Sequence, residues 1–75
     1  MTPEQVEAMV RERIHQEPFV PFIVELADGS EIEISHPRLA INGGGAGFFS
    51  EDGALVDFQF NLVRAIRPTT FQAIS

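Results

Sequence analysis

A stripe of apolar residues recurs at helical spacing near the start of the chain and consists of Val6, Met9, Val10 and Ile14. Thr2 precedes Pro3 and stands three residues before Gln5, which is the pattern of a capping box with proline at the first helical position. Pro18 disfavours the helical conformation in the residue before it. We therefore predict that residues 1–17 form a helical segment whose first helical residue is Pro3.

Apolar and polar residues alternate on both sides of Asp28-Gly29, which predicts a β-hairpin. A two-residue turn would mix apolar and polar groups on each face of the sheet. A three-residue loop at 27–29, with its glycine in the left-handed conformation, instead pairs Val24 with Ile32 and Phe22 with Ile34. The opposite face then collects three acidic side chains that repel one another and should be exposed to solvent: Glu25, Glu31 and Glu33.

A second hairpin is predicted from segments 48–50 and 54–60, joined by the three-residue loop 51–53 that also ends in glycine. In this register Phe49 and Leu55 face each other, away from the side shared by Phe48, Val56, Phe58 and Phe60. A single helix covers only one region of the sheet. We therefore expect Phe49 and Leu55 to bind a partner in a homo-oligomer, the alternative being that the helix of the same chain covers them.

The rest of the chain completes a fold of the α+β class. Residues 43–47 read as a flexible loop, residues 62–66 as a last strand stopped by Pro68, and residues 69–75 as a tail. We predict a single domain over residues 1–75. Its helix is followed, over residues 18–68, by a five-stranded antiparallel sheet or a small SH3-like or Sm-like barrel.

The chain has 75 residues, no cysteine and a formal net charge of −6. Without disulfides or thiolate metal sites, oligomerisation is the remaining common way to brace so small a core. The acidic balance should repel nucleic acid, because sequence-independent affinity for phosphate comes from clustered lysine and arginine. An Sm-like nucleic-acid-binding protein that uses Arg38, Arg64 and Arg67 remains an alternative if folding brings these arginines together.

Neither the histidines nor the glycines form a recognisable catalytic pattern in this sequence. The run Gly43 to Gly47 lacks the Gly-Lys-Ser/Thr of a phosphate-binding loop, and its flanks read as strands. His36 has no partner at metal-ligand spacing, so we expect it to hydrogen-bond beside Pro37. We expect no enzyme activity, no cofactor and no metal, with a small-molecule or catalytic site near His36 and the glycine loop as the second alternative.

The first nineteen residues carry several charged side chains and no continuous apolar stretch, so we expect no signal peptide or membrane span and a cytoplasmic location. These observations favour a small non-enzymatic protein-interaction module that associates with itself or with another protein.

Three motifs, Pro-Phe-Val-Pro-Phe at 18–22, Ala-Asp-Gly at 27–29 and His-Pro at 36–37, resemble a family of short uncharacterised bacterial proteins built on P-F-x-P-F, A-D-G and H-P. The resemblance implies a bacterial origin. A second, topological likeness is to Sm-like RNA chaperones, which also run from a helix through a hairpin to a short strand before proline. Their RNA-binding Tyr-Lys-His type element matches residues 60–62, where lysine and histidine are missing.

Overall fold

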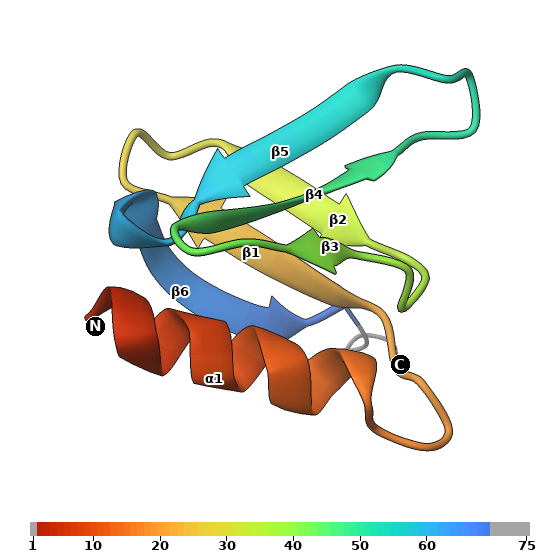
Figure 1. Cartoon of the computed structure of the whole chain (residues 1–75), viewed down its shortest axis with the longest axis horizontal. Coiled ribbons are helices and arrows are strands. Elements are labelled where there is room, and N and C mark those ends of the chain that lie inside the picture. Colours follow the sequence, from red (N-terminus) through yellow and green to blue (C-terminus); the bar gives the residue numbers. More distant parts are fainter. Residues whose placement is uncertain (1, 70–75) are drawn as a thin grey trace, which may run out of the picture.

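The computed structural model describes residues 2–69 as an N-terminal helix followed by six antiparallel strands (Figure 1). The elements are α1 (Pro3–Ile14), β1 (Phe22–Leu26), β2 (Glu31–Ile34), β3 (Ala40–Ile41), β4 (Gly45–Phe49), β5 (Leu55–Gln59), the 3-10 turn η1 (Phe60–Leu62) and β6 (Val63–Pro68). The α+β class is therefore confirmed. Most of the predicted tail lies outside the described residues.

Six strands in two sheets replace the single five-stranded sheet expected from the sequence. One sheet has the order β2-β1-β6 and the other the order β3-β4-β5. Within residues 2–69 no ladder joins the two sheets into a closed barrel. The additional strand is β3, which is only two residues long and pairs with β4.

The first helix begins as predicted and ends earlier than predicted. Thr2 Oγ1 accepts a hydrogen bond from the Gln5 N–H at 3.1 Å, and the Thr2 N–H donates to Gln5 Oε1 at 3.0 Å, which completes the capping box. The last helical residue is Ile14 rather than about Glu17. The Gln16 N–H donates to the Arg13 carbonyl, three residues back, so the final turn tightens and stops the helix before Pro18.

Both hairpins have the predicted registers. In β1–β2, Phe22 pairs with Ile34 and Val24 with Ile32, across a loop in which Gly29 has a φ of 91°. In β4–β5, Phe48 pairs with Val56 and Phe49 with Leu55, and the corresponding loop glycine, Gly53, has a φ of 88°. Only glycine adopts this left-handed backbone readily, so one residue in each loop fixes the register of the strands beside it.

The predicted flexible glycine loop is wrong, because strand β4 begins at Gly45. Asn42 Oδ1 accepts hydrogen bonds from the N–H groups of Gly44 and Gly45 at 3.0 and 2.9 Å, which closes a tight turn immediately before the strand. A β-carbon on Gly45 would collide with the Phe58 carbonyl of β5, and one on Gly47 would crowd Asp57. These glycines therefore allow two strands to approach closely rather than allowing a loop to flex.

The last strand begins and ends later than predicted, and Pro68 is part of it. Leu62 belongs to η1, and β6 pairs with β1 so that Pro68 lies opposite Phe22. A proline is tolerated here because β6 is an edge strand, where one missing N–H donor disrupts no inner ladder.

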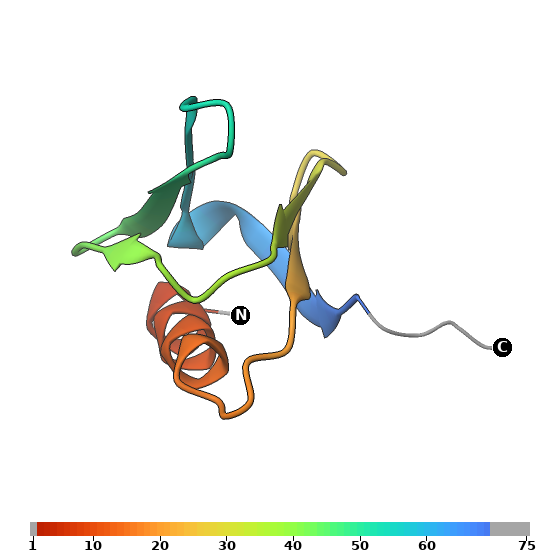
Figure 2. The same cartoon turned by 90° about the vertical axis from the view of Figure 1, so that its right-hand side faces the viewer.

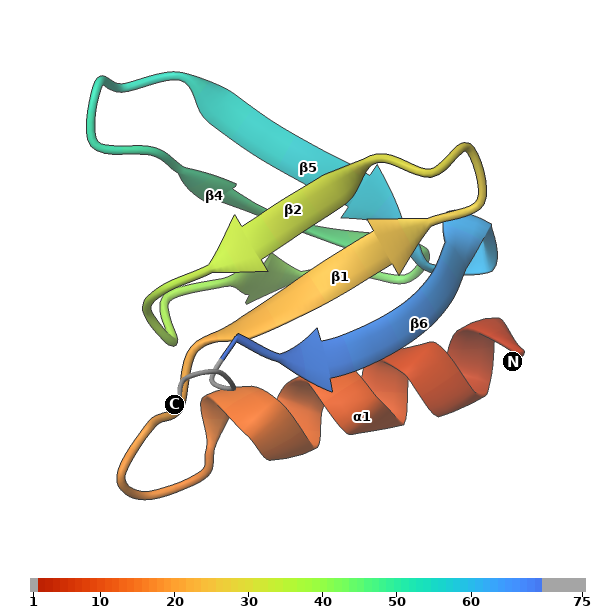
Figure 3. The ribbon, with the colours of Figure 1, turned by 180° about the vertical axis from the view of Figure 1, so that it is seen from behind.

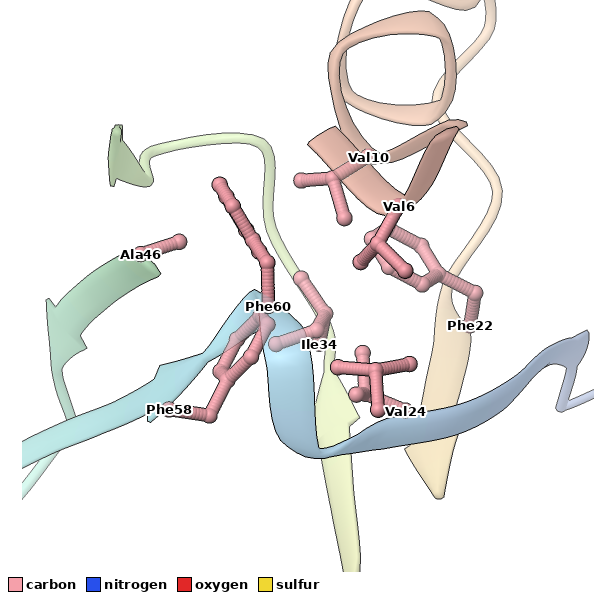
Figure 4. Packing of buried hydrophobic residues seen from close by; sticks show 9 residues of the cluster. Val6, Val10, Phe22, Val24, Ile34, Ala46, Phe58 and Phe60 are labelled. Carbon is pink, nitrogen blue, oxygen red and sulfur yellow. The ribbon is translucent and has the colours of Figure 1, made fainter. Parts of the chain in front are cut away.

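The two sheets enclose one core, and α1 closes it by packing against η1 and β6 (Figures 2 and 3). The two hairpins stand on opposite sides of the molecule in Figure 2. The buried side chains come from the helix, from both sheets and from η1 (Figure 4): Val6, Val10, Phe22, Val24, Ile34, Ala46, Phe58, Phe60 and Val63.

The close approach of β4 and β5 generates a test by glycine substitution. We expect Gly45→Ala to lower the free energy of unfolding by about 1–3 kcal/mol, the usual range for overpacking, because its β-carbon would press on the Phe58 carbonyl. Gly43→Ala is the matched control, since nothing lies within 4 Å of a β-carbon built there. Urea denaturation measures both variants, and equal stabilities would contradict the strand assignment at Gly45.

Candidate interaction surface

The outer face of sheet β3-β4-β5 carries the largest exposed apolar side chains of the described residues. Paired residues of antiparallel strands lie on the same face, so Phe49 and Leu55 share this face with Gly47 and Asp57. Phe49 is 69% exposed and Leu55 is 62% exposed. In a single chain these large apolar side chains remain in contact with water, which makes this face a candidate for contact with a partner.

The helix does not cover this face. Helix α1 contacts η1 and β6, and its buried residues Val6 and Val10 point into the core. The alternative in which the chain's own helix shields Phe49 and Leu55 is therefore wrong for the described residues. The physical reason is that Phe60, at the end of the second hairpin, turns inward and gives the helix a buried aromatic side chain to pack near.

A shallow groove of about 1070 Å³ runs over the same face. Gly45 and Gly47 line it without side chains of their own. Leu62, which is 48% exposed, adds a further apolar group along the groove. The surface therefore combines glycines and exposed apolar side chains in one groove, which can receive side chains from another molecule.

Two opposite charges line this groove. Arg38 precedes β3, and Asp57 lies in β5; both are exposed, and neither takes part in the four ion pairs found among the described residues. Sequence reasoning missed Asp57 because its partner in the ladder, Gly47, was read as part of a loop over residues 43–47. The pairing of Gly47 with Asp57 would have followed from the predicted hairpin register had β4 been started at Gly45.

Arg64 and Arg67 lie on the other sheet, where they neutralise the acidic face. Arg64 pairs with Glu25, and Arg67 reaches Glu25 at 3.1 Å and Glu31 at 2.5 Å. The predicted exposure of this acidic face is confirmed for Glu31 and Glu33, whereas Glu25 is half-buried. Arginines of β6 pair with Glu25 and Glu31, so the expected repulsion is relieved by ion pairs as well as by solvent. The hydrogen bond from Arg64 is the main reason that the pKa of Glu25 is lowered, and the charges of Arg64 and Arg67 lower it further.

The arrangement of the three arginines bears on the nucleic-acid alternative. Arg64 and Arg67 are tied to carboxylates on sheet β2-β1-β6, whereas Arg38 lies in the groove beside sheet β3-β4-β5. Positive charges that are already paired have less affinity for phosphate than free ones, because the carboxylate must be displaced first. The three residues do not form a shared basic patch.

His36 has the local role expected of it. Its Nδ1 accepts a hydrogen bond from the Arg38 N–H at 3.2 Å, across Pro37. Its ring meets the Phe48 ring edge to face, with 5.3 Å between the ring centroids. Among residues 2–69, no three histidine or acidic side chains are grouped so that they could hold a metal ion.

A scan of protein-family models, of curated proteins and of solved structures finds no match to this chain. Over the described residues, no helix has the length and apolar character that crossing a membrane requires.

The ion pairs of Glu25 predict how stability depends on pH. The pKa of this carboxyl is lowered in the folded state, so its ion pairs stabilise the fold at pH values above the ordinary glutamate pKa of 4.5. That stabilisation is lost as the pH falls through the pKa of the folded state. In an NMR titration, Arg64→Gln should move the midpoint of Glu25 upward. Arg11→Gln, which removes the same charge from the helix, should leave that midpoint in place; equal shifts in both variants would contradict the assignment.

The contacts of His36 predict a stability effect without any ligand. His36→Ala should lower the free energy of unfolding by about 1–2 kcal/mol, since it removes a hydrogen bond and an aromatic contact. His36→Asn keeps an acceptor at the same place and should lose less, as Asn42 makes the same kind of turn. Thermal denaturation measures the stability of both variants and of the wild-type chain. An unchanged stability together with loss of a bound metal or small molecule would favour a binding site instead.

Proposed function

We propose that this chain is a small non-enzymatic protein-interaction module that associates with further copies of itself through the outer face of sheet β3-β4-β5. The single observation that carries the proposal is the pair Phe49 and Leu55, which lie side by side and are 69% and 62% exposed. Fully burying two such side chains is worth about 3–6 kcal/mol together, which is a large share of the stability of a domain this small.

Charge supports a second copy as the partner on this face. Each copy carries a net charge of −6, so two copies repel one another unless they meet where few negative charges lie. The groove over β3-β4-β5 is lined by one arginine and one aspartate, and it is otherwise apolar or uncharged. The cleft between β2 and the second hairpin shares Arg38 with this groove, but it is lined by four carboxylates: Glu31, Glu33, Glu51 and Asp52.

We also infer that the fold is an opened relative of the small SH3-like or Sm-like barrels. The order of elements supports this inference, since a helix is followed by two hairpins, a 3-10 turn and a last strand that returns to pair with β1. The likeness does not favour nucleic-acid binding. Two of the three arginines that such binding would use are held by glutamates, and residues 60–62 carry no positive charge.

The proposal predicts that removing the exposed apolar pair separates the copies. We expect the wild-type chain to form a dimer or larger assembly, and a Phe49→Ser, Leu55→Ser double variant to raise the dissociation constant about 100-fold or more. Light scattering over a concentration series up to about 100 μM measures the molar mass of the assembly. This range extends well above a dissociation constant of about 1 μM. Unfolding curves should show that the variant stays folded, because both side chains are exposed in the single chain.

Ile23→Ser is the matched control. Ile23 lies on the outer face of the other sheet, in β1, and is only partly buried. Its replacement removes an apolar group of similar size without touching the proposed interface, so the assembly should persist. A wild-type chain that remains monomeric over the whole concentration series, or a double variant that unfolds, would contradict the proposed interface.

A further inference from the structure

The outer face of sheet β3-β4-β5 has an internal pattern that the proposed self-association does not by itself require. Ala40, Gly47 and Asp57 form one row across the three strands. Phe49 and Leu55 form the next row. Arg38 stands two residues before Ala40, in a tight turn where the Leu39 N–H donates to the Pro37 carbonyl, and it lines the groove over the same face.

Arg38 and Asp57 therefore lie at opposite edges of this face, Arg38 just before β3 and Asp57 in β5. Within residues 2–69 neither forms an ion pair. Two opposite charges at opposite edges of a face that is otherwise uncharged along its groove are what a self-complementary surface needs, because each can meet the other on a second copy.

We propose that two copies pack face to face about a two-fold axis that places Arg38 of each copy against Asp57 of the other. This inference rests on the proposed function and specifies its geometry. The axis lies in the interface, since only an in-plane two-fold axis turns two copies of one face toward each other. It passes midway between Arg38 and Asp57, so that it exchanges the two residues.

The same packing covers the exposed apolar pair. Phe49 and Leu55 line the same groove as Arg38 and Asp57, so two copies that meet face to face bury the two most exposed apolar side chains of each copy.

The size of the face sets the strength of this dimer. Strands β4 and β5 have five residues each and β3 has two, so the face spans at most roughly 17 by 14 Å. This area is small compared with the roughly 800 Å² per partner of a standard interface, even when the relief of the side chains is added. The complex should therefore dissociate in the micromolar range, and its charge pairs should be sensitive to reversal. Two ion pairs form per dimer, because every contact in a two-fold interface occurs twice.

Charge reversal tests the arrangement. Arg38→Glu alone should place a second carboxylate against Asp57 of the other copy and weaken the dimer about tenfold or more, and Asp57→Arg alone should do the same with two guanidinium groups. The double variant Arg38→Glu, Asp57→Arg restores opposite charges at both contacts, so its dissociation constant should return to within about threefold of wild type. An equimolar mixture of the two single variants should form a heterodimer, which native mass spectrometry distinguishes by mass from the homodimer of either single variant.

The outcomes separate this inference from the proposed function. If the single reversals leave the dissociation constant unchanged while Phe49→Ser, Leu55→Ser still dissociates the copies, self-association stands and the reciprocal charge pair is overturned. If no assembly forms with wild type, both fall. Loss of fold in either single variant, checked by circular dichroism, would also overturn the inference, because it would place the charge in the folding of one chain rather than between two.

Discussion

The three-residue loop of the second hairpin is the constraint on which the surface of this protein depends. The Ser50 N–H donates to the Ala54 carbonyl at 2.9 Å, and Gly53 takes the left-handed conformation that lets the chain reverse within three residues. A shift of the register by a single residue would exchange the two faces of β5. Phe58 would then leave the core, and Leu55 would enter it.

Once that register is set, the helix determines which apolar groups stay exposed. The inward residues of β4 and β5 lead to Phe60, and α1 packs against η1 and β6 at that end of the molecule. One amphipathic helix of twelve residues has a single apolar stripe, so it cannot also cover the opposite face of β3-β4-β5. The exposed pair Phe49 and Leu55 is thus a consequence of how the core is closed, rather than an isolated departure from the usual surface composition.

The sequence predicts the features that depend on local geometry. It does not predict those that depend on a close contact between two strands. The capping box at Thr2 and the two hairpin registers involve residues close in the chain, and alternation of apolar and polar positions is enough to define them. Gly45 pairs with Gln59 at the far end of the second hairpin, and the Phe58 carbonyl leaves no room there for a β-carbon. A run of glycines gives no sign of that contact and reads equally well as a loop.

The same limit applies to the charges. The repulsion among Glu25, Glu31 and Glu33 is evident from the hairpin register, but its relief by Arg64 and Arg67 requires knowing that β6 lies beside β1. That pairing uses up most of the positive charge on sheet β2-β1-β6 and leaves Arg38 free in the groove of the other sheet among the described residues. A chain with five arginines, no lysine and a net charge of −6 therefore keeps one balanced face, where a single arginine and a single aspartate flank the exposed apolar residues. Because like-charged copies approach most easily where their local charge cancels, the distribution of charge and the distribution of exposed apolar area select the same surface.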